Sequence, residues 1–325
     1  VLGWLVLTLT GLFLGALNAI SNQKLDTIGR YIYLGSTTQL TIGSATITFN
    51  FCRHSSYYLE AFRLLHSVDK DITQLGLKIS YRTVHISTNV AKSFFILSPL
   101  FLIYEALLGR DLYLVTAENL CFGVPVVMIM ISISLWTILC ITIKNRFQLI
   151  NNYLINLNSK KHSTLYIEQR TVFVSKLHQQ LCQSTECLTN CLSSALLVAY
   201  FECLVFFTAS MLIILDIKMD NYKNEVFFWT MLYTTITFLV ATTMELTIVE
   251  SNQTSLILCD SEIFYSTANT NLKKNSLLLQ MLHQKISFTL CGLFDLNLNK
   301  LLESIGSVTN FVMFVLQIKA RLKHD

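Results

Sequence analysis

Charge is scarce in this sequence, and so are glycine and proline. Only 14% of the 325 residues are charged, whereas a soluble domain has about 25%, so charged groups are too few to cover a water-facing surface. The 11 glycines and 2 prolines leave little sequence for barrel turns or disordered linkers. These shortages exclude disordered, collagen-like and nucleic-acid-binding chains. What is abundant is apolar sequence, 53% of the residues, with a mean hydropathy of +0.52, which indicates an all-α membrane protein.

Motifs for catalysis and metal binding are also missing. The sequence contains no P-loop, no Gly-x-Gly-x-x-Gly, no Gly-x-Ser-x-Gly and no His-Glu-x-x-His. Cys182, Cys187 and Cys191 are clustered, but their spacing is not that of a zinc site, so we expect buried thiols in a helical bundle. We therefore predict no enzymatic activity, no cofactor and no bound metal.

Seven stretches have the roughly 20 mostly apolar residues that a membrane-spanning helix needs. They are Val1–Ile20, Tyr31–Asn50, Thr88–Leu108, Asn119–Ile143, Val198–Ile217, Val226–Val249 and Leu301–Ile318. The first lacks the basic start of a signal peptide, so we read it as a span. Because the chain begins with Val, we expect residues to be missing upstream. The resulting organisation has five parts. Residues 1–143 contain spans one to four with a cytosolic helix at 51–80, and residues 144–197 form cytosolic anchor helices. Spans five and six occupy 198–249, a cytosolic segment with an anchor helix occupies 250–300, and the last span lies in 301–325.

The basic residues predict the orientation. The even-numbered connections between spans hold 15 Lys and Arg, against 5 in the odd-numbered ones, which places the former in the cytoplasm, the N-terminus inside and the C-terminus outside. We expect a multi-pass protein of the plasma membrane. This orientation is the reverse of that of G-protein-coupled receptors, and the sequence also lacks their Asp-Arg-Tyr and Asn-Pro-x-x-Tyr motifs. Both points argue against a G protein as partner.

Two cytoplasmic connections have the apolar spacing of helices. In 51–80 the apolar residues are Leu59, Phe62, Leu65, Val68, Ile72 and Leu75, and 164–197 shows the same pattern. Such helices either lie on the bilayer surface or continue spans four, five and six into a cytosolic bundle. The length of 164–197, which runs into span five without Gly or Pro, favours the bundle. Lys92, Glu202 and Glu245 either reach the interface from the inner ends of their spans or form a Lys92–carboxylate pair.

The last span carries a polar stripe. Glu303, Ser307, Asn310, Phe314, Gln317 and Arg321 follow one another at intervals of four and three residues, so they share one helix face. Lipid does not accommodate such a face. Either it packs against polar groups of the same chain, or symmetric copies surround water with it. In the second case Phe314 is a hydrophobic constriction and Gln317 a polar ring. The residue pattern alone leaves both options open.

The C-terminal segment resembles the signature of insect gustatory receptors, Thr-Tyr, five hydrophobic residues and Gln-Phe. The segment follows Cys291-Gly292-Leu293-Phe294-Asp295. Thr309 matches the Thr that often precedes the motif, the residues from Val312 to Leu316 fill the five hydrophobic positions, and Gln317 matches the Gln. The sequence departs from the motif at Asn310, Phe311 and Ile318, which replace its Thr, Tyr and Phe. A second stretch also resembles the family: its Leu-His-x-x-Leu-Cys sequence before span five is matched by Leu177-His178-Gln179-Gln180-Leu181-Cys182. The resemblance implies a homotetrameric, ligand-gated, non-selective cation channel related to insect odorant receptors. It also implies that the last span, with Ile318, lines the pore, and that inner helices form a cytosolic anchor.

The resemblance further implies a tastant pocket that opens outward among spans two to six. The candidate residues in the outer halves of these spans are Tyr31, Tyr33, Tyr104, Glu105, Phe207, Asp216, Trp229, Tyr233 and Thr237. The sweet-taste branch often carries an acid where this sequence has Val312, which favours a bitter or other non-sugar tastant over a sugar such as fructose. The expected partners are the tastant, permeant cations, other copies of the chain and lipid. The alternatives are a seven-helix receptor or transporter without its own pore, and an obligate subunit of a heteromeric chemoreceptor channel.

Overall fold

The computed structural model describes residues 27–82, 124–159, 164–215, 223–260 and 283–321, with short pieces between 85 and 92 and between 275 and 281. The labelled helices are α2 (Thr27–Arg53), α3 (Ser55–Gln74), α6 (Val124–Ser159), α7 (Thr164–Leu215), α8 (Lys223–Asp260) and α10 (Leu298–Arg321). The strands β1 (Thr289–Leu290) and β2 (Phe294–Asp295) form a small antiparallel hairpin. The predicted all-α fold is confirmed. The first predicted span and most of the third lie outside the described residues.

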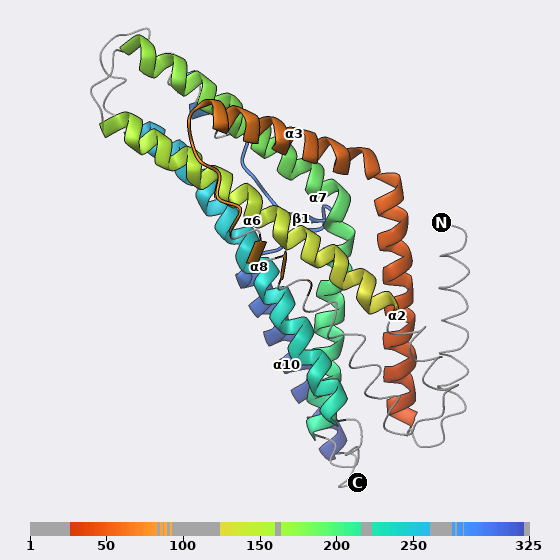
Figure 1. Ribbon diagram of the computed structural model, residues 1–325. Helices are drawn as coiled ribbons and strands as arrows, with labels where there is room; N and C mark the ends of the chain where they lie inside the picture. Colours follow the sequence, from red (N-terminus) through yellow and green to blue (C-terminus); the bar gives the residue numbers. More distant parts are fainter. Residues whose placement is uncertain are drawn as a thin grey trace.

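Three of the helices are much longer than a bilayer requires. The 52 residues of α7 extend about 78 Å at 1.5 Å per residue, more than twice the roughly 30 Å of the hydrocarbon core. The sequence Thr164–Leu215 contains no Gly or Pro, so nothing interrupts the helix. α6, α7 and α8 pack on one another along their extensions (Figure 1). The structure therefore confirms the extended bundle and rejects a surface helix at 164–197.

α7 lies at the centre of this bundle. It contacts α2, α3, α6, α8, α10 and the hairpin, and its residues Leu177 and Leu181 are completely buried. α2 approaches α7 closely at Gly43, where an added Cβ would overlap Cγ1 of Val198. Only glycine fits there without a shift of the Val198 side chain. The packing of α2 on α7 thus depends on side-chain volume at this contact.

α3 corrects one prediction. The chain turns at His54, and α3 ends in a Schellman motif at Gly76, whose φ is +77°. In that motif the Leu77 N–H donates to the Ile72 carbonyl over 3.3 Å. The buried face consists of Ala61, Leu65, Val68 and Ile72. Leu59 and Phe62, which we expected on this face, are 57% and 41% exposed. They lie about 160° and about 100° around the helix from Ala61, beyond the contact with α7.

The hairpin sets the start of α10. Its three-residue loop places Cys291 and Gly292 at φ values of 51° and 72°, in the left-handed region that glycine adopts without strain. Phe288, just before β1, is buried edge-on against Trp136 of α6, with 5.5 Å between ring centres. After β2, Oδ1 of Asn297 accepts a hydrogen bond of 2.8 Å from the Lys300 N–H and so caps the first turn of α10.

Candidate functional site: the exposed face of α10

One side of α10 packs against the rest of the chain. Leu301 and Val312 are buried on that side, and Ile305 and Val308 are half-buried between them. The neighbours are α7 and α8. The Tyr200 hydroxyl of α7 also forms a hydrogen bond with the Ser304 hydroxyl. These contacts fix how α10 is rotated about its own axis, and so determine which residues it presents outward.

The opposite side carries the predicted stripe. Its six residues, Glu303, Ser307, Asn310, Phe314, Gln317 and Arg321, are all exposed, and so is Ile318, the further predicted pore residue beside them. At about 100° per residue, the centre of this stripe lies about 180° from the packed side. The stripe therefore packs against no other part of the chain that the structure describes, which is the outcome expected of a face reserved for water or other copies. The roles of the individual residues stay predictions.

Large apolar side chains border the stripe on both edges. Leu302 and Met313, 57% and 52% exposed, lie on one edge, and Phe311 and Ile318, 58% and 43% exposed, on the other. Among the described residues, four helices are long and apolar enough to cross a membrane. In three of them 44–56% of the most apolar stretch is buried, against 11% in α10. α10 is thus the least covered of these helices by its own chain.

The polar groups of the stripe divide into two kinds. The Ser307 hydroxyl donates to the Glu303 carbonyl over 2.9 Å, so its own helix satisfies it. The amide side chains of Asn310 and Gln317 project from the exposed face, where hydrocarbon would leave them without partners. Near the start of the helix, Lys300 and Glu303 form an exposed ion pair of 2.8 Å. If several copies of the chain were arranged around one axis with this face inward, Asn310 and Gln317 would form two rings of amides and Glu303 one ring of carboxylates in contact with water.

A polar and aromatic seam between α7 and α8 contains the described part of the predicted ligand pocket. Tyr233 is completely buried, and Thr237, one turn later, donates to its carbonyl over 2.8 Å. The ring stacked on Tyr233 is Phe206, with centres 5.1 Å apart, whereas the predicted Phe207 is half-buried beside it. Helical spacing does not reveal that Phe206, rather than Phe207, faces Tyr233, because that depends on how α7 is rotated about its axis. The site of Tyr233 is thus a closely packed contact between two helices.

The same seam includes a hydroxyl pair that sequence reasoning missed. The hydroxyls of Ser210 and Thr230 form a hydrogen bond, and Thr230 also donates to the Phe206 carbonyl over 2.9 Å. Both residues are buried. The remaining predicted ligand residues are not described at side-chain level: Tyr31, Tyr33 and Trp229 lie in α2 and α8, and Tyr104, Glu105 and Asp216 lie outside the described residues.

Among the ionisable residues of the spans, Glu202 differs from both expectations. Glu202 is completely buried, and neither carboxylate oxygen has a hydrogen-bond partner among the described residues. It therefore does not reach the interface and does not pair with Lys92, whose side chain is exposed. Glu245 is exposed, as a residue that extends toward the interface would be. Glu202 lies one turn before Phe206 on α7, close to the aromatic seam.

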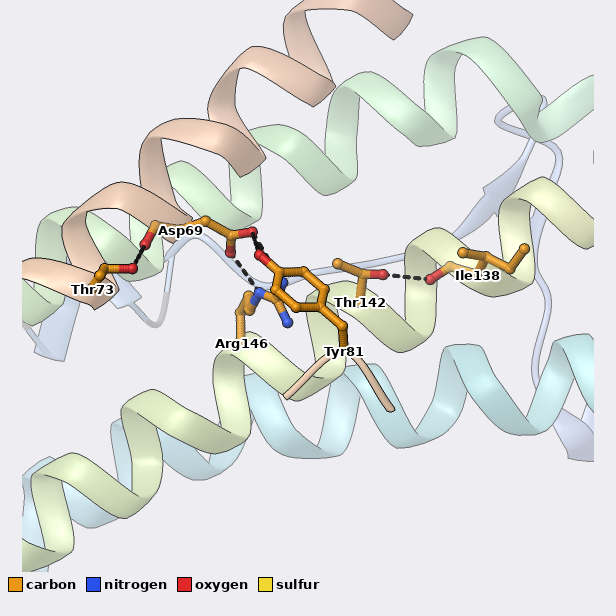
Figure 2. A network of polar contacts seen from close by, with 6 residues as sticks. All are labelled: Asp69, Thr73, Tyr81, Ile138, Thr142 and Arg146. Atoms are coloured by element: carbon orange, nitrogen blue, oxygen red, sulfur yellow. Dashed lines mark hydrogen bonds and ion pairs between the residues drawn. The ribbon is translucent and has the colours of Figure 1, made fainter. Parts of the chain in front are cut away.

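A second polar cluster joins α3 to the extended part of the bundle (Figure 2). Arg146 of α6 is buried and bonds both oxygens of Asp69 of α3, with Nε–Oδ1 2.6 Å and Nη2–Oδ2 3.0 Å. The Tyr81 hydroxyl donates to Asp69 Oδ2 over 3.1 Å, and the guanidinium carbon lies 5.2 Å from the centre of the Tyr81 ring. Burial and the neighbouring Asp69 carboxylate raise the pKa of Tyr81 above 10.0, so the phenol stays a donor.

Comparison with known proteins gives two findings. A sequence model described as 7tm chemosensory receptor matches residues 1–321. Among solved structures, an insect olfactory receptor from Machilis hrabei matches with a TM-score of 0.68 and 13% identity, over 96% of this chain and 88% of that chain. At this identity the structural likeness establishes the fold alone. A direct comparison with curated proteins gives no match.

Proposed function

This chain belongs to the 7tm chemosensory receptor family, and we propose that it is a gustatory receptor in which an external small molecule opens a non-selective cation channel. The observation that carries the proposal is the exposed stripe on α10. A membrane helix that presents amides and a carboxylate on the side away from its own chain needs water or other copies there. A pore provides both.

The borders of the stripe support assembly around an axis. When copies are arranged by rotation, the face of α10 opposite its packed side points to the axis, and the two edges meet the neighbouring copies. Those edges are apolar, formed by Leu302 and Met313 on one side and Phe311 and Ile318 on the other. The polar face then surrounds the ion path. Four copies, with the N-terminus inside, are what the likeness to gustatory receptors implies.

Within this pore each residue has a definite role. Phe314 forms the narrow apolar ring that closes the path, and Gln317 forms a polar ring one turn further outward. Asn310 provides a second amide ring, and Glu303 concentrates cations at the cytoplasmic mouth. Arg321, near the outer end, limits cation entry by its charge, so we expect modest selectivity among monovalent cations.

The ligand side of the proposal rests on the mainly aromatic set of residues that the likeness to gustatory receptors places in the pocket. Of these, Tyr233 is buried and stacked on Phe206 in the packed seam between α7 and α8. An aromatic set of residues suits a flat, largely apolar tastant better than a sugar, which needs many polar partners. We therefore favour a bitter or other non-sugar compound. A calcium-imaging screen of sugars, alkaloids and glycosides on cells that express the chain tests this choice.

Recording currents from cells that express the chain alone tests the channel itself. We expect a tastant-evoked cation current whose conductance or gating changes in Phe314→Ala and in Gln317→Ala. The matched controls are Phe238→Ala and Gln253→Ala, which alter exposed residues of α8 away from the stripe. A current that no substitution on the stripe alters would refute the pore assignment. A current that requires a related receptor would identify an obligate subunit instead.

A further inference from the structure

Aromatic rings bridge the break between α2 and α3. α2 ends at Arg53, the chain turns at His54, and α3 begins one residue later. Across this turn Phe51 lies 5.4 Å from Tyr58, and Tyr58 lies 4.8 Å from Phe62, measured between ring centres. The three rings form a continuous row that holds the elbow together. Phe51 and Phe62 are nevertheless 40% and 41% exposed.

Beyond this row, α3 has an outward face that combines apolar and basic residues. Leu59 is 57% exposed and follows the ring row toward the side turned away from α7. The side chains of Arg53, Arg63 and Lys70 are also exposed, at the elbow and along the same outward face. A helix with one packed side and such an outer side has the composition of an interfacial amphipathic helix.

The acidic residues of α3 do not neutralise this face. Asp69 bonds the buried Arg146, and Asp71 lies 3.7 Å from Nζ of Lys176 on α7. Only Glu60 is exposed beside the basic groups, 3.6 Å from Arg63, and both of these side chains are at least 50% exposed. Pairs of that kind contribute little, so Arg63 keeps most of its capacity to bind an external anion. The exposed charge of the elbow is positive.

The position of the elbow selects the partner. The predicted second span, Tyr31–Asn50, is part of α2 and ends three residues before Arg53, so the elbow lies where the span leaves the cytoplasmic leaflet. α3 does not continue along the axis of α2 but turns away from it (Figure 1). A surface that continues directly from a span meets headgroups first, and the headgroups of this leaflet carry negative charge.

We propose that the α2–α3 elbow is a binding site for anionic phospholipids of the cytoplasmic leaflet. Leu59 and Phe62 enter the boundary between headgroups and acyl chains, and Arg53 and Arg63 bind the phosphate and carboxylate groups. The site fixes the level of α3, and through α3 the packing of α7, relative to the bilayer. It depends on α2 being a span but not on the pore, so it stands or falls separately from the channel assignment.

A spin label tests the depth of the elbow in the full-length chain. The exposed residues Cys52, Cys259 and Cys291 are first replaced by Ser, and a label is placed by Leu59→Cys or by Val172→Cys. Val172 is 51% exposed and lies about 39 Å along α7 from the predicted inner end of span five. In nanodiscs of phosphatidylcholine and phosphatidylserine, we expect the label at position 59 to collide with oxygen more than with a water-soluble nickel chelate, and the label at 172 to do the reverse.

Equal behaviour of the two labels would overturn the proposal. So would a label at position 59 that neither reagent reaches, because a second copy of the chain would then cover the elbow. Both results are readable whether or not the chain conducts ions. The label replaces an exposed side chain, so folding is expected to persist, and a native elution volume and α-helical spectrum verify it.

The charge part of the proposal has its own test. Native mass spectrometry of the chain released from those nanodiscs gives the ratio of retained phosphatidylserine to phosphatidylcholine. We expect Arg53→Gln with Arg63→Gln to lower this ratio fivefold or more, since one basic side chain near an anionic surface contributes about fivefold. The control, Lys78→Gln with Lys285→Gln, removes the same charge at other exposed positions. An equal fall in the control, or no fall in the elbow variant, would contradict a specific site.

Discussion

The helices α7 and α10 are both apolar enough to cross a membrane, but their surroundings differ sharply. Of the apolar stretch that could span a membrane, 56% is buried in α7 and only 11% in α10. Helices of the same chain surround α7, whereas the described residues contact α10 on one side only. Similar hydropathy thus serves two purposes in our proposal: α7 stabilises the subunit, and α10 joins subunits and lines the pore.

The first prediction separates these purposes by charge, and we expect the largest effect here. Gln317→Lys adds one positive charge per copy to the proposed ring, where field lines are focused in a low-dielectric setting. The cation conductance should fall tenfold or more with little change in the amount of folded protein. Single-channel recording measures it, and Gln253→Lys on the exposed surface of α8 is the control. Equal conductance in both variants would contradict the ring at Gln317.

The second prediction compares packing. Leu181 of α7 is completely buried, so Leu181→Ala removes methyl groups from the cytosolic core and should lower the free energy of unfolding by about 2–5 kcal/mol. Met313 of α10 is 52% exposed within one chain, so Met313→Ala should change the stability of the subunit by less than about 0.5 kcal/mol. Thermal unfolding in detergent measures the first effect. Assembly measured by light scattering should respond to the second variant only.

The third prediction concerns the ties around α7 and has the smallest expected effect. Asp69→Asn leaves the buried Arg146 without its counterion and should cost about 1–3 kcal/mol, less than the roughly 3–5 kcal/mol for a fully buried pair because the Asp69 side chain is 24% exposed. Asp71→Asn removes a pair whose Lys176 is 60% exposed, so the cost should stay below about 1 kcal/mol. Chemical unfolding of the detergent-solubilised chain ranks them. The reverse order would show that the Asp69–Arg146 contact does not hold α3 to α6.

Periodicity in the sequence was sufficient for the extended helix α7 and for the stripe on α10. The continuous apolar pattern of 164–197 predicted the extension of α7, and the spacing from Glu303 to Arg321 predicted one face that the structure leaves exposed. Both depend on residues close together in the chain. The extent of a helix and the clustering of polar residues on one of its faces follow from local spacing.

Features that depend on distant segments could not be read in this way. The apolar spacing of 51–80 indicated a buried face but not its width, which the contact with α7 determines. Leu59 and Phe62 were therefore placed on the buried face, although the structure leaves them exposed. The bond between Asp69 and Arg146 joins residues 77 positions apart. The burial of Glu202, and the choice of Phe206 over Phe207 as partner of Tyr233, depend on the rotation of α7 against α8. Only the assembled helices determine that rotation.

The most direct test of the account is a cysteine scan of α10 in membranes that contain the full-length chain. Single cysteines at successive positions from 302 to 318 are treated with a charged, membrane-impermeant thiol reagent while current is recorded. We predict that the current changes at positions 303, 307, 310, 314 and 317, which belong to the stripe. It should stay constant at positions 305, 308 and 312, which lie on the packed side. Modification without this periodicity, or restricted to the packed side, would contradict a pore lined by the exposed face of α10.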